Sequence, residues 1–383
     1  MLNSDIADVI IIGAGPAGSR LAWRLARQNR TVILIEKRKM MGESVCCTGL
    51  ISPHCFNEFG LNQDLIINRF NSARIHSPSG EIAHVKRRDT QAVVVDRTIF
   101  DQALMQKAMN AGVQLKLGMI AENIQIFADR VVIKTSQEDK QQEISAKTVV
   151  IASGLNQRFT SMLGLGTVRD FAIGVQLEVE DVNITDVDVY LGNSLAPGFF
   201  AWMVPTSTRH AKLGMIVRHH PMEHMHRLLT RINEDNGTQI PFEKPVCRPI
   251  PLKSLRKTYG DRVLVIGDAA GQVKTTSGGG IYYGLLCADI AADILKEAIP
   301  QNKLLDRDLK KYEYTWRNRL QRDMFVGQLA RKFLQHTGDS QLDKLVRKTH
   351  TSALLEKLLD DDRLSFDWHG PAFIKWFSGV FRA

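Results

Sequence analysis

The sequence predicts an α/β fold in which a Rossmann-type nucleotide-binding domain is joined to an antiparallel-sheet domain and a helical C-terminal region. Three observations predict this fold. The chain opens with an apolar strand that leads into a glycine turn and an amphipathic helix. From about residue 170, strands follow one another with no helix between them, which is typical of an antiparallel sheet. From about residue 303 to 360 the pattern is charged and helical.

Length and composition limit the possible classes of protein. With 383 residues, 44% of them hydrophobic, the chain can bury the cores of two or three regions. It contains no run of about 18 uncharged apolar residues, so we expect no transmembrane helix. Its first residues are acidic and lead directly into a strand, which is typical of neither a signal peptide nor a transit peptide. We therefore expect a cytoplasmic protein.

The charge of the chain is strongly positive, with a net value of +9 and a pI near 9.3. Basic clusters such as Lys86–Arg87–Arg88 could meet phosphates or the anionic inner face of a membrane, or they could form an ordinary solvated surface. The sequence contains no RRM signature or zinc finger, so no nucleic-acid partner is expected.

The five cysteines are predicted to be free thiols. An odd number in a reducing compartment argues against a disulfide framework, and no paired Cys/His spacing of a zinc site occurs, so no metal is expected. Cys46 and Cys47 are neighbours, and a bond between them would close a strained ring. Cys55 is expected to lie in the core.

The first chemical motif is the glycine turn GAGPAG, in which Gly13, Gly15 and Gly18 form the pattern GxGxxG with Ala17 between them. It lies between a buried strand and a helix, and Glu36 ends the second strand. The glycines let the backbone close around a pyrophosphate at the helix N-terminus, and a carboxylate at Glu36 can accept from ribose hydroxyls. The motif therefore predicts a dinucleotide site.

A second motif far downstream distinguishes FAD from NAD. In RVLVIGDAAG an apolar strand ends at Asp268, and a carboxylate suits the hydroxyls of a ribityl chain, which FAD has and NAD lacks. TTSGGGIYYG then opens a helix, so the backbone at Gly279, Gly280 and Ile281 can face a phosphate or the isoalloxazine edge. Only one complete fingerprint occurs, which predicts one tightly held FAD and, at most, transient binding of NAD(P)H.

The other elements complete the three regions. A hairpin is predicted at 72–87, a strand, helix and strand within 92–118, and strands at 130–136 and 147–154. Four further strands are expected at 171–180, 186–192, 198–207 and 211–218, and a helix at 222–235. The result is a discontinuous, glutathione-reductase-like FAD-binding domain (residues 1–71, 93–159 and 256–300), an antiparallel β substrate domain (residues 72–92 and 160–255) and a C-terminal helical region (residues 301–383).

The order of GAGPAG, VDRTIFDQAL and VIGDAAG resembles that in flavoproteins of the p-hydroxybenzoate hydroxylase type. Within that group the chain resembles the geranylgeranyl reductase family, which saturates isoprenoid C=C bonds. The narrower resemblance rests on four segments: CTGLIS (47–52), PGFFAWMVP (197–205), TTSGGGIYYG (275–284) and KYEYTWRNRL (311–320). It covers about residues 7–325. The chain departs from the family at Ser153, where an aspartate is usual, and at Phe200 and Val204, where the family has tyrosine and phenylalanine.

The resemblance implies roles for further residues. It places the cysteine loop along the flavin, with Cys47 as the family's cysteine; this thiol either donates a proton or packs as a small apolar group. It places Arg97 near the FAD, where the alternative is a surface arginine, and the backbone of Ala121 near the adenine. The implied cofactor residues of the loop are Cys46, Cys47 and Gly49, and the implied substrate residues are Phe200, Trp202 and Pro205.

The implied activity is an FAD-dependent reduction of C=C bonds in a polyprenyl lipid, with NADPH or a small redox protein such as ferredoxin as the electron donor. The sequence identifies no certain acid for the proton. FAWMVP is close to the W-x-W-x-I-P motif of halogenases, so a flavin monooxygenase or halogenase remains an alternative, as does a flavin electron carrier. Aromatic and basic residues between Trp368 and Arg382 predict either a peripheral membrane contact or a capping helix.

Overall fold

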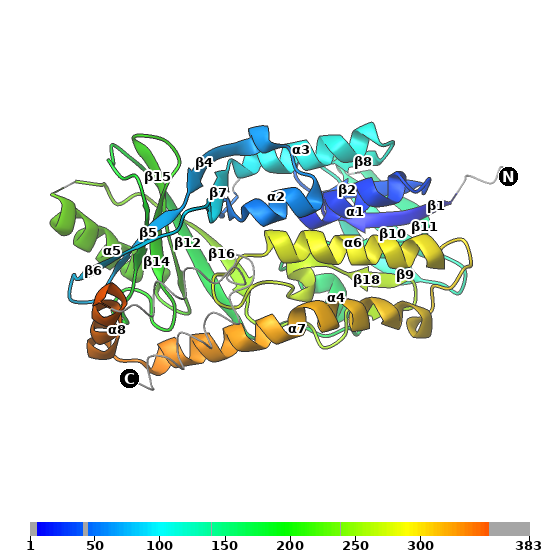
Figure 1. Ribbon diagram of the computed structural model, residues 1–383. Coiled ribbons are helices and arrows are strands. Elements are labelled where there is room, and N and C mark those ends of the chain that lie inside the picture. The colour runs from blue at the N-terminus through cyan, green and yellow to red at the C-terminus, as the bar shows by residue number, and fades with distance from the viewer. Residues whose placement is uncertain (1–5, 41–44, 139, 238, 352–383) are drawn as a thin grey trace.

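A computed structural model describes residues 6–40, 45–138, 140–237 and 239–351 of the protein. In these residues the strands form two large sheets and one small sheet of three strands. The two large sheets lie at opposite ends of the molecule in Figure 1, and the long helix α7 (Asp306–His336) extends from one toward the other. The mixture of parallel and antiparallel sheets confirms the predicted fold class.

The first sheet is the Rossmann-type sheet that the N-terminal motif predicts. Its central strands are parallel, and an antiparallel meander extends from one of them. In spatial order the path is β17 (Tyr259–Gly260), β18 (Val263–Val265), β11 (Lys140–Ile151), β1 (Ala7–Ile12), β2 (Val32–Glu36) and β8 (Gln114–Leu117), with β10 (Val131–Gln137) and β9 (Ile120–Ile126) in the meander.

Both faces of this sheet are covered, which explains why β1 is buried along its whole length. Val9 and Ile11 pack with helices α1 (Pro16–Ala26), α3 (Arg97–Asn110) and α6 (Ile281–Ala298). Ile10 and Ile12 point the other way and pack with the meander and with the short helix α4 (Arg158–Met162). Because the strand is parallel and buried, the glycine turn that follows its carboxyl end is held in a fixed place.

The second sheet contains the strands predicted after residue 170, together with the predicted hairpin at 72–87. It is antiparallel except for one parallel pair, β5 with β13. In spatial order its strands are β16 (Val246–Pro251), β12 (Phe171–Glu180), β15 (His210–Val217), β14 (Ala201–Pro205), β13 (Val187–Tyr190), β5 (Ser72–His76) and β6 (Ile82–Lys86).

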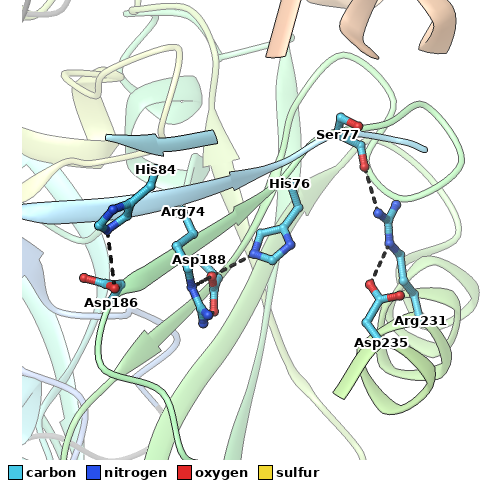
Figure 2. A network of polar contacts seen from close by, with 8 residues as sticks. All are labelled: Arg74, His76, Ser77, His84, Asp186, Asp188, Arg231 and Asp235. Atoms are coloured by element: carbon cyan, nitrogen blue, oxygen red, sulfur yellow. Dashed lines mark hydrogen bonds and ion pairs between the residues drawn. The ribbon is translucent and has the colours of Figure 1, made fainter. Parts of the chain in front are cut away.

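A buried carboxylate joins the one parallel pair of strands (Figure 2). Asp188 on β13 is 1% exposed and accepts from Arg74 Nε and Nη2 on β5, both at 2.7 Å. His76 Nε2 lies 2.8 Å from Asp188 Oδ1, and its ring stacks on Tyr190 with centroids 4.4 Å apart. A buried carboxylate needs such partners, so this network ties the hairpin to the rest of the sheet.

Helix α5 (Pro221–Asn236) covers one face of the second sheet: Met225, Leu228 and Ile232 are buried against Met203 and Met215. The opposite face carries Trp202, because β14 and β15 pair in a register that places Trp202 opposite Gly214 and side chains alternate between faces. The second sheet therefore has one face for its own core and one face for other partners.

The small sheet holds the cysteine loop in place. Its strands are β3 (Leu50–Ile51), β7 (Ala92–Val95) and β4 (Ile66–Phe70). Helix α2 (Pro53–Phe59) follows, with the Ser52 side chain accepting from Cys55 N at 2.9 Å, and a single turn, η1 (Gln63–Leu65), leads into β4. A Cβ on Gly49 would lie only 2.2 Å from Val95 O, so the loop can approach β7 only with glycine there.

The C-terminal part is helical over the described residues, as predicted, and ends with α8 (Asp339–Thr351) after α7. The aromatic segment from Trp368 to Arg382 lies outside the described residues. Strand β16 and the small sheet were not predicted. We propose that the two large sheets mark the FAD-binding and substrate domains with the boundaries given above.

Candidate functional site

The turn between β1 and α1 has the backbone geometry of a phosphate cradle. A Cβ on Gly18 would lie 1.9 Å from Gly13 O, and one on Gly13 would lie 2.4 Å from Ala152 O, so both positions exclude a side chain. Gly15 has open space around it and is the N-cap of α1, where no side chain caps the helix. The first N–H groups of α1 are therefore available to an anion.

Glu36 lies at the end of β2 beside this turn and is 6% exposed. Its carboxylate accepts from Ala14 N at 2.9 Å and from Arg38 N at 3.0 Å. A carboxylate can accept about four hydrogen bonds, so capacity for a ribose hydroxyl remains.

Asp268 lies in the turn η2 (Gly267–Ala270), at the end of β18. Within the described residues, no hydrogen bond or ion pair reaches its carboxylate. Burial raises the pKa of the Asp268 carboxyl, and the charge of Arg97 partly opposes that rise. Burying a carboxylate without hydrogen-bond partners costs free energy. The Asp268 carboxylate therefore needs donors from a ligand.

The two distant motifs meet in the structure. A Cβ on Gly267 would lie 3.3 Å from Ala17 Cβ, and a Cβ on Gly280 would lie 2.7 Å from Asp268 Oδ1. Gly280 is the N-cap of α6, which begins at Ile281 and, like α1, has no side-chain cap. Two uncapped helix N-termini, the open space at Gly15 and the unpartnered carboxylate of Asp268 fit FAD.

Arg97 is brought close to this centre rather than to the surface. It is the first residue of α3, and its side chain is 12% exposed. Its guanidinium donates to Asp101 Oδ1 at 2.9 Å and Oδ2 at 3.0 Å. Burial opposes its charge, but the Cys47 sulfur and the Asp101 carboxylate outweigh burial and raise the pKa of Arg97. Arg97, the first residue of α3, thus has both the Cys47 sulfur and the Asp101 carboxylate beside it.

The two adjacent cysteines have different surroundings. Cys47 Sγ lies beside Arg97 and 3.4 Å from Gly49 N. Cys46 Sγ instead lies 3.4 Å from Val246 O and 3.7 Å from Gly174 O, on the second sheet. Burial, with smaller contributions from Cys47 and Cys247, raises the pKa of Cys46 to about 12. All five cysteines are free, and Cys55 is fully buried, as expected of a core residue.

Trp202 connects the second sheet to the cysteine loop. Its Nε1 donates to Thr48 Oγ1 at 2.7 Å, and Phe200 meets its ring edge-on with centroids 5.8 Å apart. A Cβ on Gly214 would lie 2.6 Å from the indole, so the ring lies directly over that glycine. The strand alternation places the Pro205 side chain on the other face, and the Pro205 carbonyl accepts from Asn68 Nδ2 at 3.2 Å.

The remaining sequence-based candidates lie at the edges of the site. Ala121 is on β9, two residues after Met119, whose N–H donates to Glu36 O at 3.0 Å. Ser153 follows Ala152, which contacts the glycine turn, and its hydroxyl makes a long 3.5 Å contact to Asn156 O. The roles of these residues remain predictions.

Thr48 and Gly214 are site residues that the sequence analysis does not single out. Thr48 belongs to the CTGLIS segment, so its position next to Cys47 was a usable signal. Gly214 lies inside a strand, and a glycine within a strand often marks a close approach, here by the Trp202 ring.

The described residues contain neither a metal-binding cluster nor a helix suited to span a membrane. No group of three or more His, Cys, Asp or Glu side chains there is arranged to hold a metal ion. None of the described helices combines the length and the apolar character needed to cross a membrane.

Known proteins resemble this chain over most of its length. The family model for pyridine nucleotide-disulphide oxidoreductase matches residues 7–185. A curated relative, the digeranylgeranylglycerophospholipid reductase of Methanocaldococcus jannaschii, is 30% identical over 360 residues, which cover 89% of this chain and 90% of that protein.

Two solved structures share the fold. One is a geranylgeranyl bacteriochlorophyll reductase-like protein from Thermoplasma acidophilum, with a TM-score of 0.88 and 23% identity, covering 98% of this chain and 97% of that one. The other is a halogenase in complex with phloroglucinol and FAD, with a TM-score of 0.71 and 13% identity, covering 98% of this chain and 86% of that one. The identity to the curated relative, which extends over most of both chains, confirms the resemblance seen in the motifs. The chain belongs to the geranylgeranyl reductase family of FAD-dependent oxidoreductases.

Proposed function

We propose that this protein reduces C=C bonds in the geranylgeranyl chains of a glycerophospholipid. One observation carries the proposal: Trp202 lies over Gly214 and donates to Thr48, so a broad aromatic surface adjoins the loop that contains Cys47. Burying a prenyl chain on such a surface stabilises it by about 25 cal/mol per Å² and requires few polar partners. The curated relatives that match most of the chain are named for reduction of this class of lipid.

We assign the FAD to the cradle formed by Gly13, Gly15 and Gly18, with Glu36 at the ribose and Asp268 at the ribityl hydroxyls. Bound in its reduced form, FAD supplies the hydride that saturation of a C=C bond requires. Gly49, Gly279, Gly280 and Ile281 would border the ring, and Ala17 and Ala121 the rest of the cofactor.

We assign the catalytic position to Cys47. Its sulfur lies beside Arg97, whereas the Cys46 thiol, with a pKa raised to about 12, is a poor acid at neutral pH and packs on the second sheet. Phe200 and Trp202 would orient the chain and exclude water. We further propose NAD(P)H or a small redox protein as the electron donor, and a peripheral contact with the inner membrane face, supported by the lipid substrate and the net charge of +9.

The test uses the FAD-loaded protein, reduced anaerobically with dithionite and mixed with digeranylgeranylglycerophospholipid. Mass spectrometry should show lipid products that gain hydrogens in pairs. In a parallel reaction opened to air, oxygen uptake with hydroxylated or halogenated products would support the monooxygenase or halogenase alternative instead. Rapid reoxidation by a quinone with the lipid unchanged would indicate an electron carrier.

A further inference from the structure

The face of the second sheet that carries Trp202 continues from an aromatic end to a charged end. Trp202 lies opposite Gly214, strand alternation places Ile216 on the same face, and Arg218 follows directly after β15 ends at Val217. A Cβ on Gly278, in the glycine loop that opens toward α6, would lie 3.2 Å from Ile216 Cδ1. Gly214 and Arg218 are four residues apart, about 13 Å at roughly 3.3 Å per residue.

At the charged end, two arginines share one carboxylate. Arg218 Nη2 donates to Asp170 Oδ1 at 2.8 Å, and Arg331 Nη2 lies 3.5 Å from Asp170 Oδ2. We call Arg218 and Arg331 the arginine pair. Asp170 lies two residues before Ala172. Ala172 pairs with Ile250, and the strand registers place the Ala172 side chain on the same face as Ile216. The arginine pair therefore lies at the end of the surface that begins at Trp202.

Arg331 is unusually short of partners for a buried cation. Its side chain is 5% exposed, its Nε is buried with no hydrogen-bond partner, and among the described residues its other nitrogens donate no hydrogen bond. Burial lowers the pKa of Arg331, with Asp170 opposing and Arg218 adding to that effect. A guanidinium has five N–H donors, and one carboxylate cannot satisfy two such groups. The arginine pair thus has one positive charge more than Asp170 balances.

Arg331 is also held against the predicted substrate segment. Its guanidinium carbon lies 5.8 Å from the centre of the Phe199 ring, next to Phe200. One turn earlier on α7, a Cβ on Gly327 would lie 2.4 Å from Thr275 Oγ1, at the start of the glycine loop. Helix α7 therefore fixes Arg331 relative to both the aromatic surface and the cofactor loop.

We propose that Arg218 and Arg331 bind the phosphate of an anionic head group on the prenyl lipid, while its apolar chain extends toward Trp202. This inference rests on the proposed function. Guanidinium forks match phosphate oxygens in pairs, and a dianionic or monoanionic phosphate compensates the excess charge. The site would recognise phosphate, so its ligand comes either from the lipid or from free phosphate in solution.

The test measures binding, which does not depend on turnover. FAD-loaded protein in its oxidised form is titrated calorimetrically with geranylgeranyl phosphate, geranylgeraniol and inorganic phosphate. We expect Arg331→Gln and Arg218→Gln each to weaken binding of geranylgeranyl phosphate about 10- to 100-fold and to leave geranylgeraniol unchanged. Arg227→Gln, on the exposed side of α5 with Glu223 as its partner, serves as the matched control and should change neither.

Equal weakening of binding for both prenyl ligands would mean that the arginines have only a structural role. Unchanged binding of geranylgeranyl phosphate in both variants would mean that the arginines bind no anion. Inorganic phosphate binding as tightly as geranylgeranyl phosphate would assign the site to a free anion. Each of these results would overturn the proposal. Arg218→Gln keeps the test valid should Arg331→Gln fail to fold, because Arg218 is 34% exposed. Failure of lipid reduction with intact, arginine-dependent binding would reject the proposed function alone.

Discussion

The indole nitrogen of Trp202 donates a hydrogen bond to the Thr48 hydroxyl across 2.7 Å, although the two residues are 154 positions apart. Trp202 belongs to the second large sheet, and Thr48 follows Cys47 in the loop beside the small sheet. This contact therefore sets the position of the aromatic surface relative to the cysteine loop.

Removing this hydrogen bond should slow lipid reduction. Thr48→Val keeps the shape of the side chain but leaves the indole N–H without its acceptor, at roughly 1–3 kcal/mol. We expect kcat/KM for the prenyl lipid to fall about tenfold while FAD content stays complete. Thr48→Ser retains the hydroxyl and is the matched control. If both variants reduce the lipid as fast as the original protein, the contact has no part in positioning the chain.

The Asp268 carboxylate should lower the stability of the apoprotein and raise its affinity for FAD. Its folded pKa lies above the ordinary value of 3.8, so the stability it contributes is present below that pH and is lost as pH rises through the raised pKa. Asp268→Asn should therefore raise the melting temperature of the apoprotein at pH 7, with the gain disappearing below about pH 4. The same change should weaken FAD affinity about 10- to 100-fold, since a hydrogen bond to a charged group contributes ~1.5–3 kcal/mol.

Asp129→Asn, at an exposed position beside Arg130, is the control for Asp268→Asn. Thermal scans of apoprotein and flavin titrations measure the two effects. An apoprotein that loses stability at pH 7 on Asp268→Asn would show that the carboxylate already has partners in the protein.

Asp188 should matter for stability rather than for catalysis, because it lies on the face of the second sheet opposite Trp202. Asp188→Asn removes the charge that Arg74 and His76 share, and should lower the free energy of unfolding by about 1–3 kcal/mol. This is less than the ~3–5 kcal/mol of a fully buried pair because Arg74 is 35% exposed. Urea unfolding measures the change. Asp186→Asn, nearby and more exposed, should change it by under about 1 kcal/mol; equal effects would contradict the special role of Asp188.

The adjacent cysteines should respond differently to the same substitution. Cys47→Ser should slow the reoxidation of photoreduced protein by prenyl lipid while FAD is retained, because its sulfur lies beside Arg97 at the cofactor site. Cys46→Ser should do less, since Cys46 Sγ lies against the backbone carbonyls of Val246 and Gly174 on the second sheet. Rates are followed anaerobically by flavin absorbance. Equal rates for Cys47→Ser and the original protein would leave Cys47 a packing role.

The local parts of the fold and site could be predicted from the sequence. The glycine turn and Asp268 follow buried strands and Glu36 ends one, so their positions depend on a short-range pattern. Strand β16 was missed because Pro249 and Pro251 break the strand pattern, although prolines are tolerated on the outermost strand of a sheet.

Contacts between distant segments could not be predicted. The parallel pairing of β5 with β13, the Trp202–Thr48 hydrogen bond and the sharing of Asp170 by Arg218 and Arg331 all join segments that are far apart in the sequence. No periodicity within a segment specifies such pairs. A single sequence indicates that Arg331 is on a helix, but not that the structure buries it.

The central claim is that electrons held by this protein saturate C=C bonds of a prenyl lipid. Its most direct test is an anaerobic single turnover, in which protein with fully reduced FAD is mixed with excess digeranylgeranylglycerophospholipid. Flavin oxidation is followed by absorbance, and saturated bonds are counted by mass spectrometry. We predict one C=C bond saturated for each FAD oxidised. Oxidised flavin with no change in the mass of the lipid would contradict the claim.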